Sequence, residues 1–320
     1  MRQRSAFSIP VKTPPRDGGG VTVTVDELAL LRADAARFFS TAPDAVAGLF
    51  PGLYRSLIRG RGLEFEEVRH YQPGDDYRVI DWRVTARTGH LYTKVFREER
   101  ERTVLLGLDA SKSMRFGTRR AFLWVAAAQA LGLLAWMAAD NHDRVGGIVI
   151  GGGKGIGETR PILGAAGALR LFRLWEESGQ RHAETAGEGL LEGLLRLRHH
   201  ARHGALVVLA SDFREWNDEI QRLTAGLARR NGVVLLQLFD PIKSGLPEAG
   251  WLGFSDGEKV LAVDTRNDAS RERVHRDFAA RAAAPQRFCA DHTIRFLQIN
   301  NQLTPPESLH RAVKRAAVPA

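Results

Sequence analysis

The chain has almost none of the cysteine on which small secreted domains depend. Cys289 is the only cysteine among 320 residues, so an internal disulfide is excluded. The first twenty residues are rich in proline, glycine and basic groups, and they lack the apolar core of a signal peptide. Both absences lead us to expect a cytoplasmic protein with a flexible N-terminal arm over residues 1–25.

Uncharged apolar runs of membrane-spanning length are also missing, apart from residues 121–139. Eight of these nineteen residues are alanine, which contributes little hydrophobicity. The run also lies between two strand-like segments, where an α/β fold requires a covering helix. We therefore predict a buried crossover helix here and no membrane span.

Charge of one sign is not concentrated in any part of the chain. The 46 Lys and Arg residues outnumber the 37 Asp and Glu residues, which gives a formal net charge of +9. Because the basic residues are scattered, this charge permits an acidic partner without indicating nucleic acid. The length suits one large domain or two smaller ones.

The stretch around which the chain is organised is residues 103–114. It begins as an apolar run typical of a strand buried on both faces, and it ends in Asp109, Ser111 and Ser113. Ligands of open parallel sheets bind outside the carboxyl ends of strands, and Mg²⁺ binds one or two carboxylates together with neutral oxygens and water. The three residues therefore indicate either a cation site or N-caps of the following helix.

A second strand ends in the same way. Residues 205–210 form another apolar run, which is followed by Ser211 and Asp212. If this strand neighbours the strand at 103–108, Asp109 and Asp212 share one rim of the sheet. Two carboxylates with two or three hydroxyls at one rim favour the cation site over the capping interpretation.

From residue 103 onward, strand-like and helix-like segments alternate. We predict strands at 103–108, 144–150, 156–162, 205–210 and 232–239, and helices at 119–140, 164–177, 187–202 and 216–230. Right-handed crossovers between such strands give an α/β fold with a doubly wound, mostly parallel sheet.

Smaller elements are predicted on either side of this sheet. A helix begins at Asp26, and strands at 63–71, 79–82 and 91–96 form a small β-rich unit. Beyond the sheet we predict a strand at 259–264, a helix at 268–285, a strand at 293–298 and a polar tail from residue 304. The predicted division is an arm at 1–25, a helix with the β-rich unit at 26–102, an α/β domain at 103–264 and a C-terminal segment at 265–320.

Two groups of residues resemble known proteins. Asp109, Ser111 and Ser113 followed by Asp212 resemble the metal-ion-dependent adhesion site (MIDAS) of von Willebrand factor A domains. A longer set of motifs between residues 53 and 264 resembles a bacterial family known as domain of unknown function 58. These motifs are Gly62-Leu-Glu-Phe65, Arg69-His-Tyr71-Gln-Pro-Gly-Asp75, Arg78-Val-Ile-Asp-Trp82, Thr85-Ala-Arg87, Leu108-Asp-Ala-Ser-Lys-Ser-Met114, Asp143-Arg-Val145, Ser211-Asp-Phe213 and Asp240-Pro241.

The resemblance implies a von Willebrand factor A-like fold with a Mg²⁺ or Mn²⁺ site. In such a site Ser111 and Ser113 ligate the cation directly, while Asp109 and Asp212 bind it through water or orient the water. An acidic side chain from a partner protein completes the coordination.

One position departs from the adhesion-site pattern. The site normally takes a threonine from the loop before the helix that precedes the second strand, and Glu188 stands there, with Thr185 three residues upstream. Glu188 either supplies an oxygen ligand or forms a charge pair that replaces the metal.

The resemblance also implies partners. The family is usually encoded beside a MoxR-type AAA+ ATPase and is thought to act with it in chaperone-like maturation or assembly of other proteins. We therefore expect a non-enzymatic adaptor that binds this ATPase and client proteins.

The motif block at 62–87 has two interpretations. Its charged residues either form salt bridges that lock the β-rich unit around a tryptophan, or they form a docking surface for a partner; paired charges are a common structural device, which favours the first. The residues concerned are Arg69, Asp75, Arg78, Asp81, Trp82 and Arg87.

Two other functions fit parts of the sequence. A metal-dependent phosphohydrolase would use Asp109 as its nucleophile, but the general acid belongs two residues on, where Ser111 stands. A nucleic-acid-binding protein would use Arg55, Arg59 and Arg61, but no nucleic-acid-binding signature accompanies them.

Overall fold

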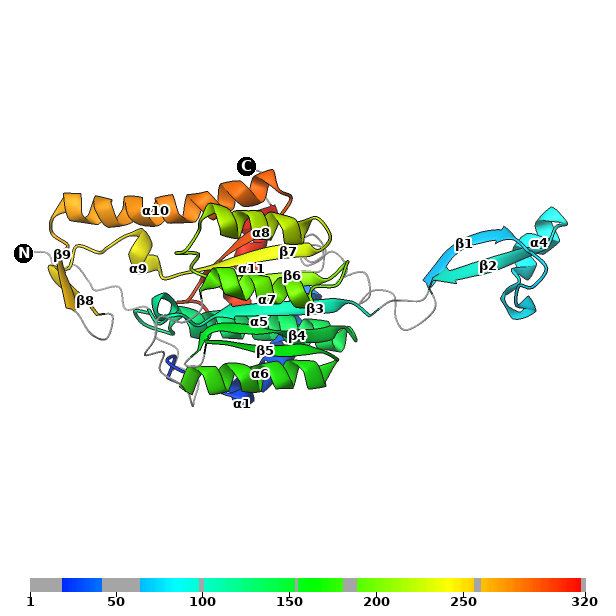
Figure 1. Ribbon diagram of the computed structural model, residues 1–320, viewed down its shortest axis with the longest axis horizontal. Coiled ribbons are helices and arrows are strands. Elements are labelled where there is room, and N and C mark those ends of the chain that lie inside the picture. Colours follow the sequence, from blue (N-terminus) through cyan, green and yellow to red (C-terminus); the bar gives the residue numbers. More distant parts are fainter. Residues whose placement is uncertain are drawn as a thin grey trace, which may run out of the picture.

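A six-stranded sheet forms the centre of the computed structural model, which describes residues 19–41, 64–97, 101–152, 155–180, 189–255 and 260–317 (Figure 1). In spatial order the strands are β10 (Arg295–Asn300), β7 (Gly232–Phe239), β6 (Leu206–Ser211), β3 (Thr103–Asp109), β4 (Arg144–Gly152) and β5 (Gly155–Leu163). All neighbours are parallel except β4 and β5, which are antiparallel. The predicted α/β fold with a mostly parallel sheet is confirmed.

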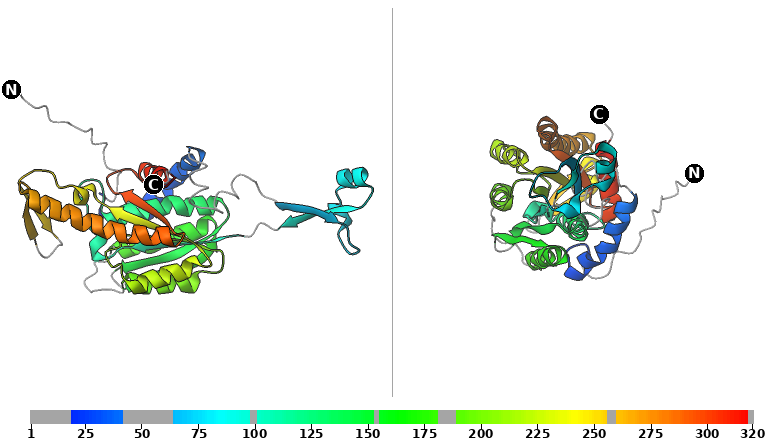
Figure 2. Two further views of the ribbon diagram at one scale, coloured as in Figure 1. Left: turned by 90° about the horizontal axis from the view of Figure 1, so that it is seen from above. Right: turned by 90° about the vertical axis from the view of Figure 1, so that its right-hand side faces the viewer.

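Helices cover both faces of this sheet (Figure 2). One face packs against α5 (Leu123–Asp140), α6 (Ala165–Gln180) and α11 (Pro305–Ala317), and α1 (Val25–Thr41) lies on these helices. The other face packs against α7 (Leu190–His200), α8 (Asp218–Ala228) and α10 (Asp268–Asp291). Side chains of a strand alternate between faces, so Leu106 and Leu108 enter the first core while Leu105 enters the second.

Helix α5 is apolar on every side because it is buried on every side. Among the described residues it is the one helix long and apolar enough to cross a membrane, and 94% of that window is buried in the fold. Leu28 of α1 packs where Gly132 leaves room on α5, and the Trp136 Nε1–H donates to the Leu28 carbonyl at 2.8 Å. The predicted buried crossover helix between β3 and β4 is confirmed.

The α/β domain extends further along the chain than predicted. β10 is an edge strand of the same sheet, and α1 lies against α5. Residues 305–317 form α11 and not a polar tail, because Leu309, Ala312 and Val313 share one buried face of an amphipathic helix. The predicted boundary at residue 264 is therefore wrong, since it cuts through one domain.

A small unit precedes the sheet and is set apart from it in Figure 1. It comprises the antiparallel strands β1 (Glu64–His70) and β2 (Tyr92–Arg97), the 3-10 turn η1 (Tyr77–Val79) and the helix α4 (Trp82–Thr88). The strand predicted at 79–82 is wrong because two aspartates start helical turns there. Asp76 accepts from the Arg78 N–H, and Asp81 accepts from two N–H groups at the start of α4.

A hairpin lies between β7 and α10 in the chain. It consists of β8 (Trp251–Ser255) and β9 (Val260–Asp264), and the short helix α9 (Pro241–Ser244) leads into it. β9 was predicted from the sequence, whereas β8 was not.

Candidate functional site

The candidate site lies at the carboxyl ends of β3 and β6, which are neighbours in the sheet. Asp109 ends β3 and Ser211 ends β6, so Asp212 follows directly at the same rim. Ser111 and Ser113 come from the start of η2 (Lys112–Met114), the 3-10 turn after β3. The structure therefore brings the four expected residues of this rim together.

Three side-chain oxygens of the rim form a continuous chain. Ser111 Oγ lies 3.2 Å from Ser113 Oγ, and Ser113 Oγ lies 3.2 Å from Asp212 Oδ1. In an octahedral Mg²⁺ site with bonds of about 2.1 Å, adjacent ligand oxygens are about 3 Å apart. The chain thus has the spacing of neighbouring ligands, and the residues fit a small hard cation.

Asp109 is only 5% exposed, and both of its carboxylate oxygens accept hydrogen bonds from the protein. Oδ1 accepts from the Ser111 N–H at 2.9 Å, and Oδ2 accepts from Ser211 Oγ at 2.6 Å. The two oxygens thus bind the loop after β3 and the end of β6. This suits a role for Asp109 in orienting water and not in direct ligation of a cation.

Burial raises the pKa of Asp109 to about 6, and the charge of Asp212 adds to this rise, while the hydrogen bond from Ser211 opposes it. Within the described part of the chain, neither carboxylate forms an ion pair with Lys or Arg. A cation at the rim would supply the missing positive charge.

The backbone fixes these oxygens from two sides. Gly151 has φ +71°, and a Cβ built on it would lie 2.8 Å from the Ser111 Cα, so only glycine allows this close approach. Phe213 has φ 50°, which is uncommon for a residue other than glycine. Its N–H donates to Ser211 Oγ at 3.0 Å, which holds the loop that carries Asp212.

The alternative in which Asp109 and the serines cap the following helix is wrong. α5 begins at Leu123, and its N-cap is Phe122. Ser111 is the N-cap of η2 but makes no side-chain capping bond. Its hydroxyl is therefore available to the rim.

Several expected residues lie outside the described part of the chain. They are Glu188, Thr185, Arg55, Arg59 and Arg61. Gly189, which is described and precedes α7, lies against the loop after β6, since a Cβ built on it would be 2.7 Å from Glu215 Oε2.

Sequence reasoning did not assign Ser211 to the site, although its hydroxyl donates to Asp109. A hydroxyl at the end of a buried, otherwise apolar strand was the available signal for Ser211.

A second polar cluster was also missed, at the ends of β7 and β10. Asp240 is fully buried and accepts hydrogen bonds from the Thr118 N–H at 2.9 Å, Asn301 Nδ2 at 3.0 Å and Gln302 Nε2 at 2.8 Å. Burial raises the pKa of Asp240, but the hydrogen bonds, including one from Ile242, outweigh this and hold the pKa below its ordinary value. Asp240 therefore anchors the loop between η2 and α5.

The motif block at 62–87 divides into structural and exposed residues. Arg69 pairs with Asp75 at 2.7 Å, and Asp81 lies 3.7 Å from Lys94, so salt bridges do stabilise the unit. The unit is not locked around Trp82, however, because that side chain is 65% exposed. Arg78 and Arg87 are also exposed.

The described residues contain no group of three or more His, Cys, Asp or Glu that could hold a metal ion. A cation at the rim would therefore depend on the serine hydroxyls, which suits Mg²⁺ or Mn²⁺ better than softer metals.

The family model described as "Protein of unknown function DUF58" matches residues 67–284. The chain belongs to this family. The uncharacterized protein Rv1480 of Mycobacterium tuberculosis is 31% identical to this DUF58 chain over 258 residues, which are 80% of this chain and 78% of that protein. The uncharacterized protein YeaD of Bacillus subtilis is 41% identical over 49 residues, 15% of this chain and 12% of that protein.

Solved structures give weaker similarities to this DUF58 protein. BatB from Bacteroides thetaiotaomicron gives a TM-score of 0.38 at 13% identity and covers 68% of this chain and 98% of that one. A von Willebrand factor type A protein from Catenulispora acidiphila gives a TM-score of 0.31 at 14% identity and covers 46% of this chain and 35% of that one. Likeness at these scores carries no functional argument.

Proposed function

We propose that this DUF58 protein is a non-enzymatic, cytoplasmic adaptor that binds protein partners through a Mg²⁺-dependent site at the rim of β3 and β6. Ser111, Ser113 and Asp212 would hold the cation, and Asp109 would orient its water. An acidic side chain of the partner would fill a remaining coordination position. The partner we propose is a MoxR-type AAA+ ATPase, with which the protein would act in maturation or assembly of client proteins.

The observation that carries this proposal is the chain of three oxygens at 3.2 Å spacing beside a buried carboxylate that pairs with no Lys or Arg of the described residues. This arrangement supports cation binding more than hydrolysis. A nucleophilic Asp109 would need a free oxygen facing substrate, whereas both of its oxygens accept hydrogen bonds from the protein.

The test is the binding of the purified MoxR-type ATPase to wild type, Ser113→Ala and a control, in Mg²⁺ and in EDTA. Ser113→Ala removes the middle oxygen of the chain and leaves Asp109 and its hydrogen bonds in place. The matched control is Ser178→Ala, which removes a hydroxyl bonded to the Leu174 carbonyl within α6. Circular dichroism confirms that each variant is folded.

We expect wild type and the control to bind in Mg²⁺ about tenfold or more tightly than in EDTA, because EDTA removes the bridging cation, and loss of even an outer-shell partner of a metal site costs about 10–100-fold. Ser113→Ala should bind equally weakly in both. The metal-dependent site would be refuted if wild type bound the ATPase equally tightly in Mg²⁺ and in EDTA, and if Ser113→Ala bound it as tightly as wild type.

A further inference from the structure

The small unit of β1, β2 and α4 exposes side chains that its own fold does not use. Tyr77 is 67% exposed, Trp82 is 65% exposed and Leu91 is 45% exposed. The unit is held by the pairing of β1 with β2 and by the aspartate caps of η1 and α4. Large exposed aromatic side chains gathered on one small unit are typical of an interaction surface.

Three arginines accompany these aromatic side chains. Arg78 lies over the Tyr77 ring, with its guanidinium carbon 5.8 Å from the ring centroid. Arg83 and Arg87 are exposed and stand four residues apart on α4, so they share one face of the helix. Within the described residues, none of the three takes part in an ion pair.

The nearby carboxylates are engaged elsewhere. Asp75 pairs with Arg69, Asp76 accepts from a backbone N–H of η1, and Asp81 caps α4 and pairs with Lys94. Among the side chains that the structure describes, no carboxylate of the unit pairs with these three arginines, which leaves them open to carboxylates or phosphates of a ligand.

The charge of the unit decides between these ligands. Residues 64–97 contain six acidic residues (64, 66, 67, 75, 76 and 81) and six basic residues (69, 78, 83, 87, 94 and 97), so the unit has no net charge although the chain carries +9. A nucleic-acid surface draws its affinity from an excess of positive charge along the phosphate backbone, and this unit has none. Tryptophan, tyrosine and arginine together are instead typical of the centre of a protein–protein interface.

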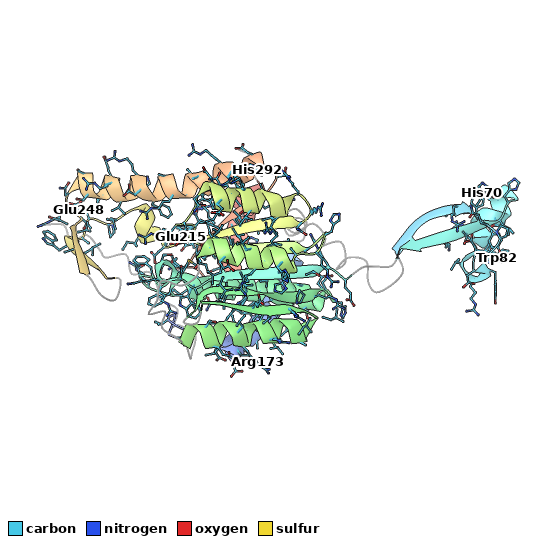
Figure 3. The ribbon with its side chains drawn as sticks, viewed as in Figure 1. His70, Trp82, Arg173, Glu215, Glu248 and His292 are labelled. Atoms are coloured by element: carbon cyan, nitrogen blue, oxygen red, sulfur yellow. The ribbon has the colours of Figure 1, made fainter. Side chains whose placement is uncertain are left out.

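We propose that the α4 surface, made of Tyr77, Arg78, Trp82, Arg83 and Arg87, binds an acidic segment of a partner protein. The indole and phenol rings pack against apolar side chains of that segment, and the guanidinium groups pair with its carboxylates. This surface is separate from the rim of β3 and β6 and needs no metal, so its test is independent of the cation site. Trp82 lies on the small unit, away from the main sheet (Figure 3).

The test uses fluorescence anisotropy with the full chain in EDTA. The probes are two fluorescein-labelled peptides of equal length that share their Leu and Phe positions and carry either Glu or Lys elsewhere, and an oligothymidine of similar length. The variants are Arg83→Glu with Arg87→Glu, and Trp82→Ala. The control is Arg170→Glu with Arg173→Glu, which makes the same charge change on the exposed face of α6.

We expect wild type and the control to bind the Glu peptide in preference to the Lys peptide. Each α4 variant should bind the Glu peptide about tenfold or more weakly, with unchanged circular dichroism. Absence of binding by wild type, equal losses in the control, or tighter binding of the oligothymidine to this surface would each overturn the proposal.

Discussion

Replacing the buried carboxylate of Asp109 with an amide should make the metal-free protein more stable. Burial raises the pKa of Asp109 from 3.8 to about 6. This difference corresponds to a cost of about 3 kcal/mol for holding the ionised group in the folded state near neutral pH. Asp109→Asn removes that cost. In wild type Oδ2 accepts a hydrogen bond from Ser211 Oγ, whereas the amide nitrogen of the variant would donate at this position, and reversing the hydrogen bond costs about 1 kcal/mol. We expect a net gain of about 1–2 kcal/mol.

The sign of the pH dependence follows from the raised pKa. Between pH 3.8 and about 6 the folded state binds the Asp109 proton more tightly than the unfolded state does. As pH rises through this window, the free energy of unfolding of the metal-free wild type should therefore fall relative to that of Asp109→Asn. Above the window, the difference between the two proteins should stay constant. Mg²⁺ at neutral pH should stabilise wild type more than Asp109→Asn, since the variant keeps the proposed ligands but lacks the carboxylate that orients their water.

The assay is urea unfolding followed by circular dichroism, in EDTA and in Mg²⁺. The matched control is Asp277→Asn, which makes the same substitution at an exposed position of α10 and should change little in either buffer. The reasoning fails if Asp109→Asn is less stable than wild type in EDTA at neutral pH. It also fails if Mg²⁺ stabilises Asp109→Asn as much as wild type.

Three further substitutions test other parts of the fold by the same unfolding assay. Gly151→Ala should lower the free energy of unfolding by about 2–4 kcal/mol, because the new methyl group would lie 2.8 Å from the Ser111 backbone. The control Gly204→Ala, at φ +82° with nothing within 4 Å, should lower it by only about 1 kcal/mol. Equal losses in the two variants would show that the close approach at Gly151 is unimportant. Asp240→Asn should lower the free energy of unfolding by about 2–4 kcal/mol at neutral pH. This loss should shrink in acid, because the wild-type carboxylate, with its lowered pKa, stabilises the fold only while it is ionised. A loss that does not depend on pH would contradict this. Leu309→Ala should cost about 2–5 kcal/mol, since the side chain is fully buried; an unchanged midpoint would show that α11 does not pack on the domain.

The main sheet could be predicted because its strands are long apolar runs. Residues 103–108, 205–210 and 232–239 are buried on both faces, so their sequences are apolar without alternation, and few other structures give that pattern. The neighbouring ends of β3 and β6 then followed from topology rules, which is why Asp109 and Asp212 could be paired from the sequence.

Short and amphipathic elements were harder to predict. Three of residues 79–82 are β-branched or aromatic, which favours a strand, but the caps at Asp76 and Asp81 decide in favour of helical turns. α11 begins with two prolines and carries four charged residues among its 13, so its four buried positions were not distinguished from a polar tail. In both cases a few capping or packing contacts outweigh the average composition of the segment.

The polar clusters of the rim depend on contacts between distant residues. Thr118, Asp240 and Asn301 come from three loops, and no local pattern links them. The same holds for Ser211 at the end of β6, whose hydroxyl donates to Asp109 at the end of the neighbouring strand β3. Sequence spacing identified which residues end strands, but the hydrogen bonds between the loops required the fold.

The position of α5 between elements from opposite ends of the chain has a consequence for protein synthesis. α1 is made before α5 and can cover one side of it at once, whereas α11, which covers another side, is made after every other element of the domain. During translation, a helix long and apolar enough to cross a membrane therefore has one side uncovered until α11 has emerged from the ribosome. Nascent chains in this interval offer a hydrophobic surface to lipid, to targeting factors and to one another, and the last helix to be made ends that exposure.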